Sequence, residues 1–218
     1  FDQATKKAKG NDREAKEQIA VMEPLIAALR EGKPARSVEF SKEQQVTVKR
    51  LQLLTDKPIM YICNVGEDDA ATGNAYSAEV EEWAKSQGAT AVTIAAAIEA
   101  EVASLETEEE QAEFLESLGL SEPGLARVIR SGYELLGLLT FFTCGPKEAR
   151  AWTVYDGASA PEAAGEIHTD FQRGFIAAET IGFGDYIACN GEQGAKEAGK
   201  MRQEGRDYRV KDGDVMLF

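Results

Sequence analysis

The sequence has 218 residues, of which 43% are hydrophobic and 28% charged, the composition of an ordinary soluble globular protein. Its formal net charge of −14 argues against a surface that clamps nucleic acid as a whole. No apolar run approaches the roughly 18–20 residues that a membrane span needs, so we expect no membrane partner.

The cysteines and the start of the chain add two expectations. Cys63, Cys144 and Cys189 are far apart and odd in number, so we expect reduced thiols in a cytoplasmic protein and no metal site. The chain begins at Phe1 without an initiating Met or an apolar leader. We therefore expect a fragment or truncated form of a longer protein.

Charge is unevenly distributed along the chain. Residues 1–57 carry 12 Lys and Arg against 9 Asp and Glu, whereas residues 58–144 carry 3 against 16 and residues 145–218 carry 9 against 13. Any contact with RNA is therefore expected first in the amino-terminal part.

Residues 13–31 predict a helix, because Ile19, Met22, Ile26 and Leu29 recur on one stripe. An internal proline is expected to kink this helix. The pattern suits a coiled-coil or helical-hairpin arm, and it suits equally a helix packed on a globular core.

An alternation of strands and helices follows. A helix is predicted from Ser41, whose spacing to Gln44 is that of a capping box, to about Leu54. Continuous apolarity over residues 58–63 indicates a central strand of a parallel sheet covered on both faces. A helix is then expected at residues 77–87 and a strand at 90–95. Two or three helices follow, at 97–105, at 107–118 with Thr107 and Glu110 as a capping box, and at 123–137, and then a strand at 138–142. Their short connections imply right-handed βαβ units.

At about residue 145 helices give way to short strands with glycine-rich turns, and we place a domain boundary there. The second module is predicted to be a small α+β domain. Its expected elements are strands at residues 148–155, 174–180 and 208–218 and a short helix near residues 161–164.

Asn64-Val65-Gly66-Glu67 follows the first strand, at the carboxyl end of a parallel sheet, where α/β folds bind their ligands. G-domain GTPases carry Asn-Lys-x-Asp there, and the Asp accepts hydrogen bonds from guanine N1–H and from the exocyclic amine. Adenine has an acceptor at N1 and a donor only at its 6-amine, so a carboxylate cannot bind it through two hydrogen bonds. Val65 and Glu67 therefore weaken a guanine interpretation, and Asn64 remains as a polar brace.

One βα unit later, Ala95-Ala96 follows the second strand. GTPases place a Ser-Ala-x turn there, whose backbone N–H groups contact the base. Taken alone, either stretch is a weak signal: Asn-x-x-Glu occurs in many loops, and an alanine-rich run is more often the start of a buried helix.

Several longer runs resemble the YchF family of Obg-related ATPases. In the first module the similar runs are residues 64–67, 98–101, 119–125 and 127–130. In the second module the similarity is to the TGS domain of those proteins, over residues 150–154, 163–171, 173–176, 191–202 and 211–215. The resemblance covers essentially the whole chain.

The resemblance implies an α/β fold in three parts. A helical coiled-coil arm is expected at residues 1–40, the carboxyl-terminal half of a P-loop G domain with a parallel sheet at 41–144, and a small α+β, β-grasp-like TGS domain at 145–218. Family members bind and hydrolyse ATP in preference to GTP and associate with ribosomes. The implied partners are therefore ATP and the ribosome, through rRNA and ribosomal proteins, without DNA specificity.

By motif match, the resemblance places Asn64, Val65 and Glu67 on the base-recognition loop and Ala95 and Ala96 on the following base loop. The phosphate-binding elements of the family are missing from this sequence, which contains no Gly-x-x-x-x-Gly-Lys-Ser/Thr and no Asp-x-x-Gly after a strand. We therefore expect Mg²⁺ only together with a missing amino-terminal part. We assign no catalytic residue and expect this chain alone to be inactive.

Two features outside these loops invite a functional interpretation. His168, the only histidine, has no partner for a triad or metal site and is expected to hold the turn into Asp170 and Phe171. A basic stretch interleaved with acidic residues is compatible with a solvated mixed face and with contact to rRNA phosphates. Its members are Lys196, Lys200, Arg202, Arg206, Arg209 and Lys211.

Two other functions stay open at this point. The chain could be a stand-alone ribosome- or RNA-binding module without catalysis. It could also belong to a GTPase of the same architecture, which Glu67 makes the weaker interpretation.

Overall fold

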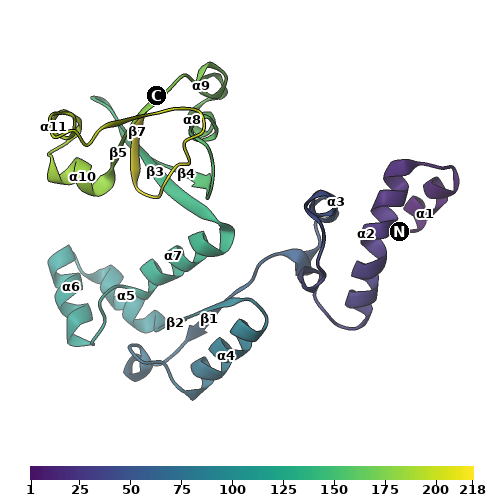
Figure 1. The fold of residues 1–218 in the computed structure, drawn as a ribbon. Helices are drawn as coiled ribbons and strands as arrows, with labels where there is room; N and C mark the ends of the chain where they lie inside the picture. The colour runs from purple at the N-terminus through teal and green to yellow at the C-terminus, as the bar shows by residue number, and fades with distance from the viewer. The chain divides into compact units, whose positions relative to one another are not determined.

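The computed structural model describes all 218 residues, and the chain divides into two compact units, Phe1–Ile59 and Met60–Phe218. Figure 1 shows the order of the helices and strands along the chain.

The first unit is helical. Its elements are α1 (Asp2–Lys9), α2 (Arg13–Arg30), the 3₁₀ turn η1 (Ala35–Ser37), α3 (Lys42–Leu51) and the 3₁₀ turn η2 (Leu54–Asp56). The helices predicted at 13–31 and from Ser41 are confirmed, and the Ser41–Gln44 capping box is present. Pro24 lies inside α2, which continues through it as one helix.

The buried side of α2 differs from the predicted stripe. Val21, Leu25 and Ala28 are buried, whereas Leu29 of the predicted stripe is 40% exposed. Val21 and Leu25 form a small core with Ala35 and Val48. The reason is that α2 packs against α1 as well as against η1 and α3, so no single 3.6-residue stripe carries all of its contacts.

The second unit begins with a parallel pair of strands. β1 (Met60–Asn64) runs parallel to β2 (Thr90–Ile94), and α4 (Ala75–Ser86) connects them. The predicted parallel strand–helix–strand order is thus confirmed. In Figure 1, α4 and α7 (Gly124–Leu136) lie on opposite sides of the two strands, and both helices contact both strands.

β1 differs from its prediction in one respect. It pairs with a strand on one edge only, and Ile62 is 50% exposed, so within this chain it is not the central, doubly covered strand that its apolar sequence indicates. Two helices follow β2, namely α5 (Ala96–Ser104) and α6 (Glu108–Ser117). The predicted Thr107–Glu110 capping box begins α6.

A five-stranded sheet forms the rest of the second unit, with the strand order β4-β3-β7-β5-β6. Its strands are β3 (Leu138–Cys144), β4 (Ala149–Tyr155), β5 (Ala178–Gly182), β6 (Arg202–Glu204) and β7 (Asp214–Leu217). β7 is parallel to β3 and antiparallel to β5. Four short helices accompany this sheet: α8 (Ala160–Ile167), α9 (Thr169–Gly174), α10 (Phe183–Ala188) and α11 (Glu192–Glu197).

The core of this domain gathers side chains from the strands and from α8. Phe141, Ala160, Ala163 and Met216 are fully buried in it, and Trp152 packs against its margin. The predicted strand at 148–155 and the short helix near 161–164 are confirmed.

Three predictions for this domain were wrong in detail. Residues 169–174 form α9, so the strand expected at 174–180 begins only at Ala178. The strand expected at 208–218 is confined to Asp214–Leu217. Finally, the strand predicted at 138–142, which sequence reasoning grouped with the first module, pairs with β4 and β7. The pairing with β7 is non-local, and local sequence patterns do not reveal it.

Candidate functional site

The two predicted base loops lie next to each other. Parallel strands end at the same edge of a sheet, so the segments after β1 and β2 meet there. The Val65 N–H donates to the Ile94 carbonyl oxygen at 2.8 Å, and the Ala96 N–H donates to the Asn64 side-chain oxygen at 2.9 Å. The structure therefore brings together the two loops that the sequence singles out.

A cluster of buried hydrophobic side chains packs against these loops. Ala95 is 3% exposed and belongs to a cluster with Ile98 and Leu115, and the half-buried Val65 packs against that cluster. The Val65 side chain therefore has a packing role, and because its N–H donates to Ile94, only its backbone carbonyl remains available at the sheet edge.

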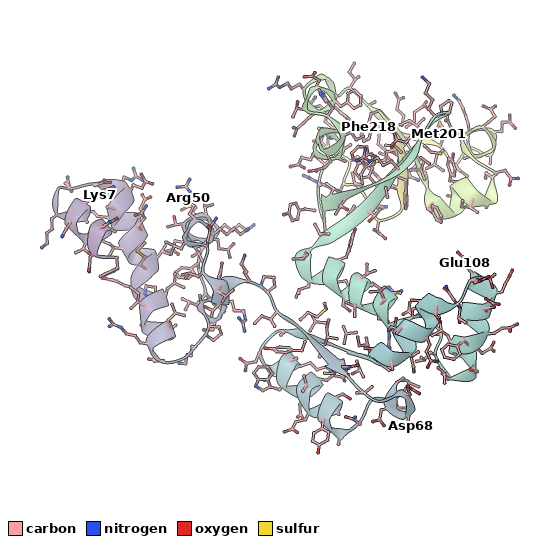
Figure 2. The ribbon with its side chains drawn as sticks, turned by 180° about the vertical axis from the view of Figure 1, so that it is seen from behind. Lys7, Arg50, Asp68, Glu108, Met201 and Phe218 are labelled. Atoms are coloured by element: carbon pink, nitrogen blue, oxygen red, sulfur yellow. The ribbon has the colours of Figure 1, made fainter.

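The acidic turn after β1 contains carboxylates in two different situations. Glu67 begins the 3₁₀ turn η3 (Glu67–Asp69) and is exposed, and its carboxylate has no hydrogen-bonding or ionic partner within the chain. Asp68, labelled in Figure 2, lies in the same turn. Asp69 instead accepts a 2.9 Å hydrogen bond from the Asn74 side chain, and Asn74 caps α4. Glu67 is thus free to meet a ligand, whereas Asp69 holds the local fold.

The second base loop starts a helix that has no side-chain cap. Ala95 is the N-cap of α5 and has no side-chain acceptor, so the first N–H groups of α5 depend on other partners. The side-chain oxygen of Asn64 accepts the hydrogen bond from the Ala96 N–H. The remaining N–H groups of this first helical turn are hydrogen-bond donors without a partner inside the helix.

A residue that sequence reasoning did not single out for this site is Glu99. Its carboxylate reaches across to α7 and accepts hydrogen bonds from the Gly124 N–H at 2.7 Å and the Leu125 N–H at 3.0 Å. The partners are 25 and 26 residues away in sequence, and no spacing rule links positions that far apart.

Across the chain, no group of three or more His, Cys, Asp or Glu side chains is placed to hold a metal ion. No helix is long and apolar enough to cross a membrane. The three cysteines are free thiols.

His168 has the structural role that the sequence predicts. Its Nδ1 accepts a 3.2 Å hydrogen bond from the Asp170 N–H and thereby caps α9. Its ring also contacts Phe171 edge to face.

The basic stretch of the second domain is largely occupied by partners within the chain. Lys200 lies 3.3 Å from Asp185, and Arg202 lies 3.0 Å from Glu204. Arg206 and Arg209 each donate to a backbone carbonyl at 2.9 Å. These contacts favour the mixed, solvated face over a surface dedicated to rRNA phosphates.

Comparisons with known proteins agree with this architecture. The family YchF-GTPase_C, described as a protein of unknown function (DUF933), matches residues 138–218. Ribosome-binding ATPase YchF of Escherichia coli O157:H7 is 54% identical over 213 residues, which are 98% of this chain and 58% of that protein. The Bacillus subtilis (strain 168) protein of the same name is 50% identical over 216 residues, with 98% and 59% covered.

Two solved structures extend the comparison. The YchF GTPase of Schizosaccharomyces pombe has a TM-score of 0.79 and 32% identity, covering 94% of this chain and 55% of that one. A GTP binding protein from Pyrococcus horikoshii OT3 has a TM-score of 0.52 and 16% identity, covering 93% and 55%, and so shows a likeness of fold alone.

The fold is that of a mixed α/β protein, combining part of a G domain with a TGS-like α+β domain. The chain spans under two thirds of the length of the relatives that it matches. It belongs to the YchF family.

Proposed function

We propose that this chain is part of a ribosome-associated P-loop ATPase of the YchF type and that it supplies the loops that select the base. In this proposal residues 1–40 belong to a coiled-coil arm, the residues from 41 up to β3 to the carboxyl-terminal half of the G domain, and the residues from β3 onwards, whose strands form the five-stranded sheet, to the TGS domain. The observation that carries the proposal is the hydrogen bond from Ala96 to Asn64, because it joins the two loops into one surface.

The chemistry of this surface favours adenine. With its oxygen engaged by Ala96, Asn64 retains its Nδ2–H donors for a ring nitrogen of the base. The α5 amides can donate to further base acceptors, while a backbone carbonyl of the loop can accept from the 6-amine. Glu67 and Val65 replace the Asp and Lys that a guanine site uses. The loop therefore lacks the Asp and Lys side chains that favour guanine binding.

Hydrolysis requires parts that this sequence does not contain. In the full-length protein we expect water to attack the γ-phosphate, with Mg²⁺ supplying charge stabilisation when it is bound. The residues of this chain bind and orient the base, which positions the phosphates for that step. Asn64, Val65, Glu67, Ala95 and Ala96 thus contribute to nucleotide choice and not to proton transfer. By itself the chain is expected to be inactive.

Fluorescent mant-ATP and mant-GTP titrations of the full-length protein test the proposal. We expect tighter binding of ATP than of GTP, and ATP hydrolysis that depends on Mg²⁺. Equal or tighter GTP binding would instead support a GTPase of the same architecture, the function in the name of the Schizosaccharomyces pombe relative.

A second candidate function is ribosome or RNA binding without catalysis, in the cytoplasm. Three lysines of α1, Lys6, Lys7 and Lys9, are exposed and have no acidic partner within the chain. Lys7 is labelled in Figure 2. Unpaired lysines can displace counterions from rRNA phosphates. Co-sedimentation of this chain with ribosomes tests this function, and its absence from the pellet at low salt would contradict it.

A further inference from the structure

The Glu99 carboxylate replaces a missing cap at the start of α7. Pro123 is the N-cap of α7 and has no side-chain acceptor for the first amides of the helix. Glu99 supplies both of its oxygens instead, one to the Gly124 N–H at 2.7 Å and one to the Leu125 N–H at 3.0 Å. A negative charge at this position also complements the positive end of the helix dipole.

Close packing around Gly124 fixes this contact. Gly124 is buried, and a Cβ there would lie 2.8 Å from the Glu99 Oε1 and 2.9 Å from the Ile94 Cγ2. Ile94 is the last residue of β2, and its carbonyl accepts the Val65 N–H. The start of α7 is therefore held against the residues that hold the two base loops.

α7 continues from this point to the five-stranded sheet. It ends at Leu136, Gly137 follows in a left-handed conformation, and β3 begins at the next residue. Near that end the Tyr133 hydroxyl lies 3.3 Å from the Thr153 hydroxyl on β4. One continuous helix thus joins the Glu99 contact to the TGS-like domain.

We infer that Glu99 is a positioning residue that fixes the base loops against α7 and transmits occupancy of the base site to the five-stranded domain. The inference rests on the proposed function, because it requires a nucleotide at these loops. A glutamine at position 99 could accept only one of the two amides, since its NH₂ group faces the other donor.

Glu99→Gln in the full-length protein tests the inference, with Glu101→Gln as the matched control. Glu101 lies on the same helix, is exposed, and its carboxylate has no partner. We expect Glu99→Gln to weaken mant-ATP binding by about 10-fold, the effect of one charge-assisted hydrogen bond, with kcat at saturating ATP within about twofold of the unchanged protein. The Glu101→Gln control should match the unchanged protein in both mant-ATP affinity and kcat.

Hydrogen exchange supplies a second readout that a purely structural role would not move. ATP should slow amide exchange at Gly124 and Leu125 and in β3 and β4 of the unchanged protein, and Glu99→Gln should lose the effect in the strands. Should Glu99→Gln fail to fold, Glu99→Asp, which keeps the negative charge, is compared with the unchanged protein by the same mant-ATP titration and hydrogen-exchange measurements.

The outcomes separate the inference from the proposed function. If Glu99→Gln binds ATP normally and keeps ATP-dependent protection of the strands, the inference is overturned and the proposed function stands. If the unchanged protein binds no ATP, both are overturned.

Discussion

The Ala96 N–H donates a 2.9 Å hydrogen bond to the side-chain oxygen of Asn64, across the ends of two parallel strands. This bond fixes which side of the Asn64 amide remains for a ligand, because the oxygen is engaged and only the Nδ2 donors are left. A side chain that the sequence presents as a general polar brace is thus oriented as a donor.

Substitution of Asn64 should separate loop positioning from contact with the base. Asn64→Asp keeps an acceptor for Ala96 but lacks the Nδ2 donors, whereas Asn64→Ala loses both. We expect mant-ATP affinity of the full-length protein to fall about 10-fold in the first and further in the second, at roughly 1–2 kcal/mol for each lost hydrogen bond. Gln45→Ala, at an exposed amide in the first unit, should bind like the unchanged protein. Normal binding by Asn64→Asp would restrict Asn64 to holding the loop.

Base preference should respond to the two positions that differ from guanine-binding loops. We expect Val65→Lys combined with Glu67→Asp to raise the ratio of GTP to ATP affinity by about 10-fold or more, because a placed carboxylate can then accept from guanine N1–H and its amine. Parallel mant-ATP and mant-GTP titrations measure that ratio. The double variant should also be less stable, since Val65 packs on the Ala95 cluster. An unchanged ratio would contradict the assignment of this loop to the base.

Two glycines of α7 should respond oppositely to alanine. Gly124→Ala places a methyl group 2.9 Å from the Ile94 Cγ2, and overpacking of this kind costs about 1–3 kcal/mol of unfolding free energy. A methyl group at Gly132 would have no neighbouring atom within 4 Å, so Gly132→Ala should stabilise the helix by up to about 1 kcal/mol. Urea unfolding of this chain measures both changes. Equal effects at the two positions would contradict the close contact at Gly124.

Tyr208 should make the chain less stable at alkaline pH. Burial, reinforced by the 2.8 Å hydrogen bond that its hydroxyl donates to Asp214, raises the pKa of Tyr208 from 10.0 to about 12. Between these values the unfolded chain loses the phenol proton while the folded chain keeps it, so this contribution is complete below about pH 10 and is lost as pH rises towards 12. Comparison of unfolding free energies at about pH 8 and about pH 11 should show a larger loss for the unchanged chain than for Tyr208→Phe.

At neutral pH the same substitution should destabilise the domain. Asp214 is 3% exposed and would keep only the Lys211 N–H at 2.9 Å and the more distant Arg202. Loss of a hydrogen bond to a buried carboxylate costs roughly 1.5–3 kcal/mol. A Tyr208→Phe chain as stable as the unchanged one near neutral pH would show that the bond contributes nothing.

The lysines of α1 should determine the salt dependence of ribosome binding. Changing Lys6, Lys7 and Lys9 to Gln is expected to reduce the fraction that co-sediments with ribosomes and to flatten its dependence on salt, because fewer counterions are released. In the control variant three exposed lysines of the second unit are changed to Gln, so that its net charge is the same. They are Lys85, Lys147 and Lys196. Equal losses in both variants would indicate an effect of net charge alone.

Sequence reasoning succeeded where the determining interactions are local. The capping boxes that begin at Ser41 and Thr107 span three residues, and both are present. The helix predicted from Ser77 in fact begins at Ala75, because Asn74 is the cap and Ser77 closes its box from inside the helix. The error is only two residues because the hydrogen bonds between Asn74 and Ser77 form a single capping box, which includes both the predicted and the observed start of the helix.

Contacts between distant residues set the limit of that reasoning. The meeting of Asn64 with Ala96 follows from two parallel strands, so the sequence could indicate it. The Glu99 contact with Gly124 depends on how α7 packs on β2, which no pattern in either segment encodes. The same holds for α2, whose buried face is set by helices on two sides.

The position of β7 has a consequence for how the second domain assembles. β7 is the last strand in the sequence, yet it lies in the middle of the sheet, between β5 and the first strand, β3. Until residues 214–217 are in place, β4-β3 and β5-β6 are two separate antiparallel pairs with no strand to bridge them. A nascent chain would therefore hold this domain open until β7 is synthesised. A premature stop codon shortly before residue 214 would therefore divide the sheet into two unconnected strand pairs, instead of removing a strand from one edge.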